Sequence, residues 1–125
     1  MLMEREVMIG RLVALLVCYR NSLKAGTFFH LYSKASGKVF LFQVLKGNSS
    51  RSVVYSIHSD SYLMWHGGMV YDQLDNNYYH VERYSSFSCL LLDMQNCAFL
   101  CKWKRNVFEI IDADLQKAYG YILLD

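Results

Sequence analysis

Cysteine, histidine and aspartate are the residues of this chain whose types could support nucleophilic chemistry. Cys18, His66 and Asp72 could serve as a thiol nucleophile, a general base and an acid that orients the base. The nucleophile of such a site belongs at the start of a helix, where the helix dipole lowers the thiol pKa. Cys18 instead stands near the end of the helix expected there, and no glutamine precedes it to serve an oxyanion hole. The placement of Cys18 therefore disfavours a cysteine hydrolase.

The candidate metal ligands are the four histidines, His30, His58, His66 and His80. No two of them are two or four residues apart, and the chain has no H-E-x-x-H motif. An acidic residue lies two positions from His58 and another lies two positions from His80, on the same strand face if the strands are regular. We expect hydrogen-bonded histidines on a sheet surface, with no metal site and no cofactor.

Aromatic residues concentrate between Tyr62 and Tyr84, where one of the two tryptophans and five of the ten tyrosines occur. Tyrosine and tryptophan supply much contact energy in protein interfaces. We expect a binding surface made of Trp65, Tyr71, Tyr78, Tyr79, His80 and Tyr84. The favoured hypothesis is a small non-catalytic protein-binding domain, of the inhibitor, immunity or accessory type, that binds a protein partner or forms a homodimer.

Binding of single-stranded nucleic acid is an alternative. Lys102-Trp-Lys-Arg105, Arg83-Tyr84 and Tyr78-Tyr79-His80 offer rings for base stacking and cations for phosphates. The formal net charge of +2 is small for such a partner, and no RNP-type motif occurs. The simpler interpretation is a solvated strand end with Trp103 packed inward.

Composition indicates one domain in a reducing compartment. The chain has 125 residues, of which 54% are hydrophobic and 19% charged, against the usual ~45–50% and ~25%. None of the four cysteines forms a C-x-x-C pair, so each is expected to be a reduced core thiol. The apolar run Leu12–Cys18 is far shorter than a membrane span and follows no positively charged segment. We therefore expect a soluble cytoplasmic protein without a membrane partner.

The order of elements predicts an α+β fold. Residues 3–24 favour a helix, and its polar stripe (Glu4, Arg11, Ser22) is so thin that the helix should be covered on more than one side. Residues 27–111 contain alternating β-type runs joined by short turns, which predicts a bent antiparallel meander of five to seven strands. Gly67-Gly68 is expected to bend the sheet, and 38–45 to be a central strand covered on both faces. In the tail, 112–125, Asp112 can cap a short helix that ends at Gly120, and Tyr121–Leu124 would then be a final strand.

A long N-terminal helix followed by a curved antiparallel sheet is similar, in element order, to the cystatin-like cone folds, which include the family resembling nuclear transport factor 2. That resemblance implies a cone or a partly open barrel with an apolar cavity. Trp65, His66, Tyr71, Asp72 and His80 would then line the cavity mouth. The resulting alternative is a small-ligand-binding protein, or a hydrolase or isomerase that uses His66 and Asp72 as an acid–base pair.

Overall fold

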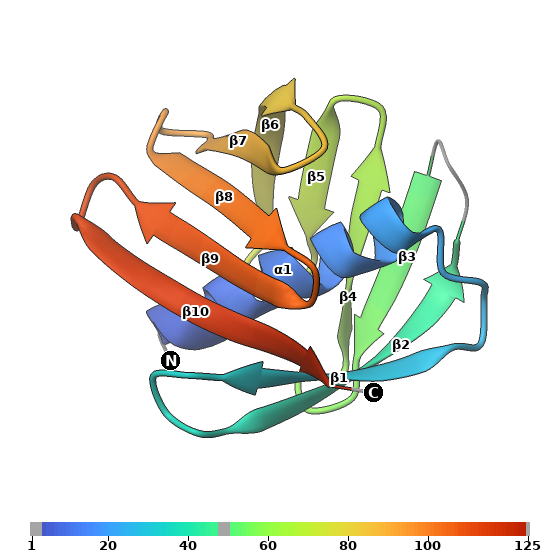
Figure 1. The fold of residues 1–125 in the computed structure, drawn as a ribbon. Helices are drawn as coiled ribbons and strands as arrows, with labels where there is room; N and C mark the ends of the chain where they lie inside the picture. The colour runs from blue at the N-terminus through green and yellow to red at the C-terminus, as the bar shows by residue number, and fades with distance from the viewer. Residues whose placement is uncertain (1–3, 48–50, 125) are drawn as a thin grey trace.

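Helix α1 (Arg5–Asn21) runs through the interior of an antiparallel barrel (Figure 1). The computed structural model describes residues 4–47 and 51–124. Every residue from Met8 to Cys18 is buried, so the helix is enclosed on all sides. This confirms that α1 is covered on more than one side, as its thin polar stripe predicted. A helix that is apolar all round can be stable in water only when other elements surround it.

The sheet consists of ten strands in the described residues. Their bounds are β1 (Phe28–Ser33), β2 (Val39–Lys46), β3 (Arg51–Ser56), β4 (Ser61–His66), β5 (Met69–Asp72), β6 (Asn77–Tyr84), β7 (Ser88–Asp93), β8 (Ala98–Lys104), β9 (Val107–Asp112) and β10 (Lys117–Leu124). Each strand pairs with its neighbours in the chain, and β1 also pairs with β10 through the register His30↔Leu124 to Ser33↔Tyr121. This last pairing closes the barrel.

The closed barrel corrects the cone or partly open barrel that the sequence suggested. A barrel widens with strand number, and about eight strands leave an interior just wide enough for side chains. Ten strands leave room for more, and α1 fills that room together with the inward side chains. Strand β2 is not covered on both faces as expected, because its outward residues Val39 and Leu45 are 42% and 47% exposed.

The tail differs from the predicted helix. Residues 113–116 form the turn of a hairpin, and β10 continues from Lys117 to Leu124. Asp112 does cap a local turn, because its Oδ1 accepts the N–H groups of Asp114 (3.1 Å) and Leu115 (3.2 Å). A capping aspartate is equally suited to a hairpin turn, and pairing of β10 with both β9 and β1 decides the outcome. Gly67-Gly68 is likewise a hairpin turn between β4 and β5 rather than a bend within a strand.

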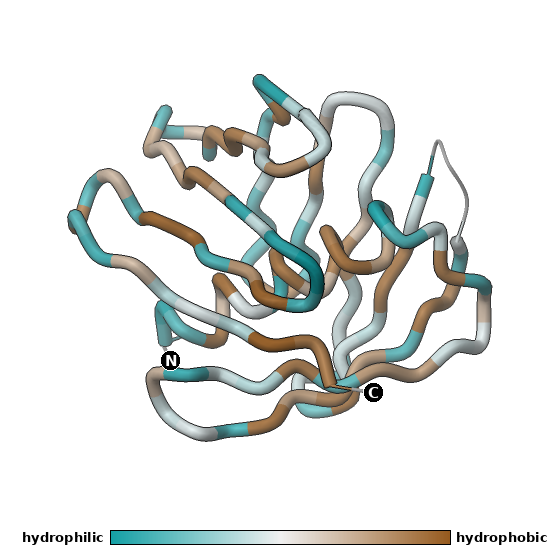
Figure 2. The backbone as a smooth tube through the Cα atoms, viewed as in Figure 1, coloured by the Kyte–Doolittle hydropathy of each residue, from teal (hydrophilic) through white to brown (hydrophobic). Residues whose placement is uncertain are grey.

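Five of the hairpin turns share one design, and the meander places all five at the end of the barrel where α1 begins. The strand entering each turn ends in a serine or aspartate, namely Ser33, Ser56, Asp72, Asp93 and Asp112. A residue with positive φ completes each turn, namely Gly37, Asp60, Asn76, Asn96 and Gln116. Figure 2 shows that the backbone of α1 and of several strands is largely apolar, whereas hydrophilic residues alternate with apolar ones in the β9–β10 turn. The unequal spacing of these turns explains why no fixed repeat is visible in the sequence.

The aromatic residues divide between the inside and the outside of the barrel. Trp65 (2% exposed) and Tyr79 (fully buried) point into the core, so the prediction that they form a binding surface is wrong. The indole N–H of Trp65 donates to the Gly67 carbonyl at 2.9 Å, and Tyr79 lies edge-on to Phe99. Tyr78 and Tyr84, by contrast, are 43% and 44% exposed.

The adjacent residues Tyr78 and Tyr79 give a matched test of this division. Tyr79→Ser removes a buried ring and should lower the free energy of unfolding by about 3–5 kcal/mol, as for other large core truncations. Tyr78→Ser removes an exposed ring and should change it by less than about 1 kcal/mol. Urea denaturation of both variants measures the difference. Equal losses for the two would contradict the strand register described here.

Candidate functional site

The Arg11–Asp72 ion pair lies inside the barrel. Arg11 Nη2 donates to Asp72 Oδ1 at 2.7 Å, and Nε lies 3.0 Å from Oδ2. The two side chains are 1% and 0% exposed. Asp72 also accepts the backbone N–H of Leu74 at 2.9 Å, so the same carboxylate caps the β5–β6 turn and holds the helix. Of the polar stripe expected on the helix, Glu4 and Ser22 are exposed, whereas Arg11 is buried and faces the Asp72 carboxylate.

One guanidinium nitrogen of Arg11, Nη1, has no hydrogen-bond partner among the described residues. Nε and Nη2 are engaged with Asp72, and Nη2 also lies 3.4 Å from the Tyr62 carbonyl. Nη1 is also closed off from solvent. Buried donors are nearly always paired, so an unpaired guanidinium N–H group indicates a place where a further acceptor can bind.

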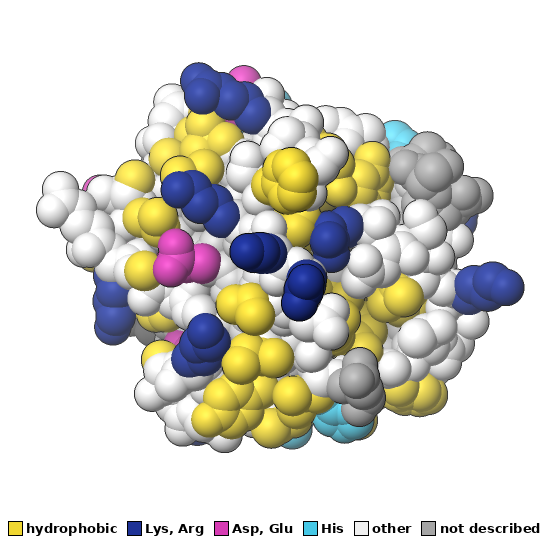
Figure 3. All heavy atoms as spheres, viewed as in Figure 1, with side chains coloured by type: hydrophobic (Ala, Val, Ile, Leu, Met, Phe, Trp, Pro, Cys, Tyr) yellow, Lys and Arg dark blue, Asp and Glu magenta, His cyan; other side chains and the backbone are white. Residues whose placement is uncertain are grey.

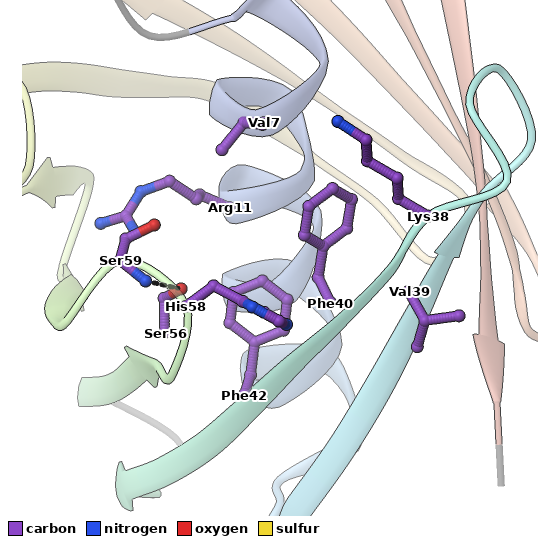
Figure 4. Close-up of a pocket in the computed structure, with 9 residues that line it drawn as sticks. All are labelled: Val7, Arg11, Lys38, Val39, Phe40, Phe42, Ser56, His58 and Ser59. Carbon is purple, nitrogen blue, oxygen red and sulfur yellow. Dashed lines mark hydrogen bonds between the residues drawn. The ribbon is translucent and has the colours of Figure 1, made fainter.

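Arg11 belongs to the lining of a cleft of about 460 Å³ between α1, β2 and the β3–β4 turn (Figure 4). This volume lies within the range of about 300–1,000 Å³ that is usual for small-molecule sites. The polar residues of the lining are Arg11, Lys38, Ser56, His58 and Ser59. The apolar residues are Val7, Val39, Phe40 and Phe42.

Local turns fix the polar side of the cleft. Ser56 Oγ accepts the N–H of Ser59 at 3.3 Å, which shapes the β3–β4 turn. The ring of His58 lies edge-on to Phe40, with 6.1 Å between centroids. Lys38 begins the approach to β2, and Figure 4 shows its side chain extending towards α1 at the rim. No ion pair involves Lys38 among the residues that the structure describes.

The structure does not bring His66 and Asp72 together. His66 is exposed beside the β4–β5 turn, whereas Asp72 is buried at the other end of β5. Because His66 pairs with Met69, Asp72 lies three residues farther along the strand, about 10 Å away at ~3.3 Å per residue. Asp72 is moreover occupied by Arg11. The acid–base pair suggested by the sequence therefore has no geometric basis here.

The cysteines are core residues rather than nucleophiles. Cys18, Cys89 and Cys101 are buried, Cys97 is half-buried, and all four are free thiols. Burial raises the pKa of the Cys18 thiol, the opposite of what a thiolate nucleophile requires. Cys89 and Cys101 face each other across β7 and β8, and their contact together with burial raises the pKa of Cys101. No cluster of three or more metal-ligating side chains occurs in the part of the chain that is described.

The other predicted contact residues lie away from the cleft. Tyr71 stacks obliquely on Tyr78 on the outer face of β5 and β6, with ring centroids 4.7 Å apart, and His80 is exposed farther along β6. Tyr84 belongs to an aromatic group at the C-terminal end of α1, where it contacts Tyr19, Trp65 and Trp103. Tyr71, Tyr78 and His80 are thus on the outer wall and Tyr84 is at the far end of the barrel, so the predicted contact residues do not form a single surface.

The basic residues considered for nucleic acid also have an ordinary place in the fold. Lys102 and Lys104 are exposed on β8, and Trp103 between them is buried, as the simpler interpretation predicted. The indole N–H of Trp103 donates to the Ser86 carbonyl at 2.8 Å, so this ring is not available for base stacking. Figure 3 shows Lys and Arg side chains over this face, interspersed with hydrophobic and acidic ones.

The sequence did not single out Arg11, Lys38 or Phe40 as site residues. Arg11 occurs in an apolar run, and a lone cation in such a run is the signal that could have found it, since buried charges are nearly always paired. Lys38 and Phe40 join it only through the closure of the barrel, which the local pattern does not specify.

Comparison of the chain with models of protein families, with curated proteins and with solved structures gives no match. Among the described residues, no helix has the length and apolar character to cross a bilayer.

The two arginine–aspartate pairs of α1 provide a matched test of the site. Arg11→Met leaves Asp72 buried and unpaired, so it should lower the free energy of unfolding by about 3–5 kcal/mol. Arg5 binds Asp112 at 2.8 Å, and Asp112 is also buried, but the Arg5 side chain is 35% exposed and Asp112 keeps two backbone N–H donors from its turn. Arg5→Met should therefore cost less, about 1–2 kcal/mol. The double variant Arg11→Met/Asp72→Asn should be more stable than Arg11→Met alone. Denaturant titration that gave equal losses for the two single variants would refute the buried pair.

Proposed function

We propose that this protein is a non-catalytic binding protein that holds a small molecule in the cleft between α1, β2 and the β3–β4 turn. The observation that supports this function best is the unpaired Nη1 of the buried Arg11 beside a cleft of about 460 Å³. A few polar groups in a largely apolar cleft are typical of ligand sites. The sequence had suggested a small-ligand-binding protein as an alternative. The proposal retains that alternative, but the residues that line the cleft differ from those expected.

A binding role is favoured over a catalytic one because the candidate catalytic groups in and beside the cleft already have other contacts. Asp72 is held by Arg11, and Ser56 Oγ is engaged with the β3–β4 turn. The ring of His58 packs against Phe40, and the four thiols lie outside the cleft lining. General acid–base chemistry requires a titratable group within hydrogen-bond reach of a reacting atom and of an orienting partner.

We propose the cytoplasm as the compartment of this protein, because all four cysteines are free thiols.

A fluorescent aromatic anion, anilinonaphthalene sulfonate, tests occupation of the cleft by the native protein. We expect saturable binding to one site, weakened at least about tenfold by Phe40→Ser, which removes an apolar wall. Phe87→Ser is the matched control, because Phe87 is 73% exposed in the turn between β6 and β7. Circular dichroism establishes that both variants are folded. Loss of the fluorescence signal by both variants alike, or its absence from the native protein, would contradict the proposal.

A homodimer formed through tyrosines on the outer wall is the second candidate. The rings of Tyr62, Tyr71 and Tyr78 follow one another across β4, β5 and β6, with centroid separations of 6.2 and 4.7 Å. Their outward neighbours Met64 and Met69 are uncharged as well. A symmetric dimer places one patch against its own copy, and an uncharged patch avoids like-charge repulsion there. This favours a second copy of the chain over a charged partner.

Light scattering over a concentration series tests the second candidate. The native protein should change from monomer to dimer mass as its concentration rises. Tyr71→Ser/Tyr78→Ser should shift that transition to at least about tenfold higher concentration, because the rings supply most of the contact area. Phe28→Ser, on the outer face of β1, is the control and should leave the transition unchanged. A native protein that stays monomeric throughout would exclude the homodimer.

A further inference from the structure

Charged side chains are divided unequally between the two ends of the barrel. Of the ten acidic residues that the structure describes, eight lie at the end where α1 begins, namely Glu4, Glu6, Asp60, Asp72, Asp75, Asp93, Asp112 and Asp114. We call the opposite end, where α1 ends, the basic end. Its turns, and the three residues on either side of them, hold eight of the thirteen Lys and Arg residues, namely Arg20, Lys24, Lys46, Arg51, Arg83, Lys102, Lys104 and Arg105. The small net charge of +2 therefore combines a basic end with an acidic one.

The two remaining described acidic residues offset only part of the positive charge at the basic end. Glu109 is the cross-strand partner of Lys102, and Glu82 directly precedes Arg83. The C-terminal end of α1 adds about half a negative charge, but two backbone N–H groups beyond the helix already bond to its last carbonyls. Even if each glutamate cancels its neighbour, six cations remain, namely Arg20, Lys24, Lys46, Arg51, Lys104 and Arg105. The basic end therefore matches a partner with several negative charges.

Aromatic rings lie among these cations where α1 meets the β6–β7 and β8–β9 turns. The guanidinium group of Arg20 lies over the Trp103 ring at 5.9 Å, and Arg20 Nη1 lies 3.4 Å from the Arg105 carbonyl. The Tyr84 ring is 5.8 Å from the Trp103 ring, and the Trp103 backbone N–H donates to the Phe87 carbonyl at 3.0 Å. Tyr84 is 44% exposed and Phe87 is 73% exposed. Figure 3 shows Lys and Arg side chains near the centre of the view, beside hydrophobic ones.

Single-stranded nucleic acid combines the two chemistries that this surface accommodates. Its phosphates bind Lys and Arg, and its unpaired bases stack on exposed rings with little dependence on sequence. A duplex keeps its bases stacked on one another, so Tyr84 and Phe87 would gain no base from it. An acidic polypeptide or an anionic bilayer supplies the negative charge without planar partners for the two rings. Charge and exposed rings together therefore favour a single strand.

We propose that the basic end binds single-stranded nucleic acid, with phosphates on Arg20, Lys104 and Arg105 and bases stacked on Tyr84 and Phe87. None of these residues lines the cleft, so this site is independent of the proposed small-molecule function. Of the rings that the sequence suggested for this partner, Tyr84 is retained. Phe87 takes the place of Trp103, which is buried and supports the guanidinium group of Arg20.

Fluorescence anisotropy with a labelled oligothymidylate of about twelve nucleotides, alone and in a duplex with oligoadenylate, tests the partner. The single strand should bind at least about tenfold more tightly than the duplex. Three phosphate contacts predict that its affinity falls roughly tenfold to twentyfold between about 50 and 200 mM salt. No binding of the strand, or equal binding of the duplex, would overturn the proposal. Polyglutamate or phosphatidylserine vesicles that bind as tightly as the strand would overturn it in favour of an acidic protein or a bilayer.

Two double variants that remove the same charge from opposite ends test the location of the site. Lys104→Gln/Arg105→Gln should weaken binding of the single strand at least about tenfold. Lys34→Gln/Lys117→Gln is the matched control, because both lysines are exposed at the end where α1 begins, and it should leave the affinity unchanged. Circular dichroism establishes that both variants are folded. Equal losses of affinity would show that net charge alone governs binding and would overturn the assignment to the basic end.

Phe87→Ser and Phe40→Ser separate this site from the cleft. Phe87→Ser should weaken binding of the single strand about fivefold or more, because it removes a stacking ring, and leave binding of anilinonaphthalene sulfonate unchanged. Phe40→Ser should have the opposite pattern, because Phe40 lines the cleft. A Phe87→Ser variant that binds the strand like the native protein would overturn the stacking role of Phe87. Failure of the dye alone to bind would count against the cleft and leave the basic end supported.

Discussion

The structure depends on the need to bury the central part of α1, which has no solvent-exposed face. Between Met8 and Cys18, α1 exposes no side chain, so its stability requires protein on every flank. A flat sheet can cover one flank of a helix, whereas a closed sheet covers all of them. The ten-stranded barrel satisfies the helix, and the helix fills an interior that side chains from the strands alone would leave incompletely packed.

Polar contacts determine how deep and in what orientation α1 lies. Apolar packing in the barrel would tolerate a helix that slides or rotates, because hydrophobic contacts are not directional. Arg5 and Arg11 remove this freedom by binding the aspartates that cap the β9–β10 and β5–β6 turns. The carboxylates of Asp112 and Asp72 thus bond to backbone N–H groups of their turns and to guanidinium groups of the helix. The hydrogen bonds that shape the two turns and the ion pairs that position the helix therefore share the same two carboxylates.

Local signals predicted most of the elements but not their closure. The alternating runs and short turns of residues 27–111 predicted the antiparallel meander, although the structure has ten strands in the described residues where five to seven were expected. The pairing of β1 with β10 joins residues about ninety positions apart, and no local pattern encodes it. A short helix was expected after Asp112 because Ala, Leu, Gln and Lys favour helix. Pairing of β10 with both β9 and β1 overrides this local preference. The candidate site was missed because Arg11 and Lys38 line one cleft only when the barrel closes around α1.

The enclosure of α1 has a consequence for biosynthesis. The helix precedes every strand in the chain, so it leaves the ribosome before any part of its covering exists. Translation of the roughly one hundred residues that follow takes on the order of 5–20 s at about 5–20 residues per second. Throughout that interval a segment as apolar as Leu12–Cys18 has no finished compartment to enter, and the last strand needed to seal it is also the last to be made. Nascent chains of this protein are therefore expected to be clients of chaperones that shield short hydrophobic segments, even though the finished barrel has no free strand edge to aggregate through.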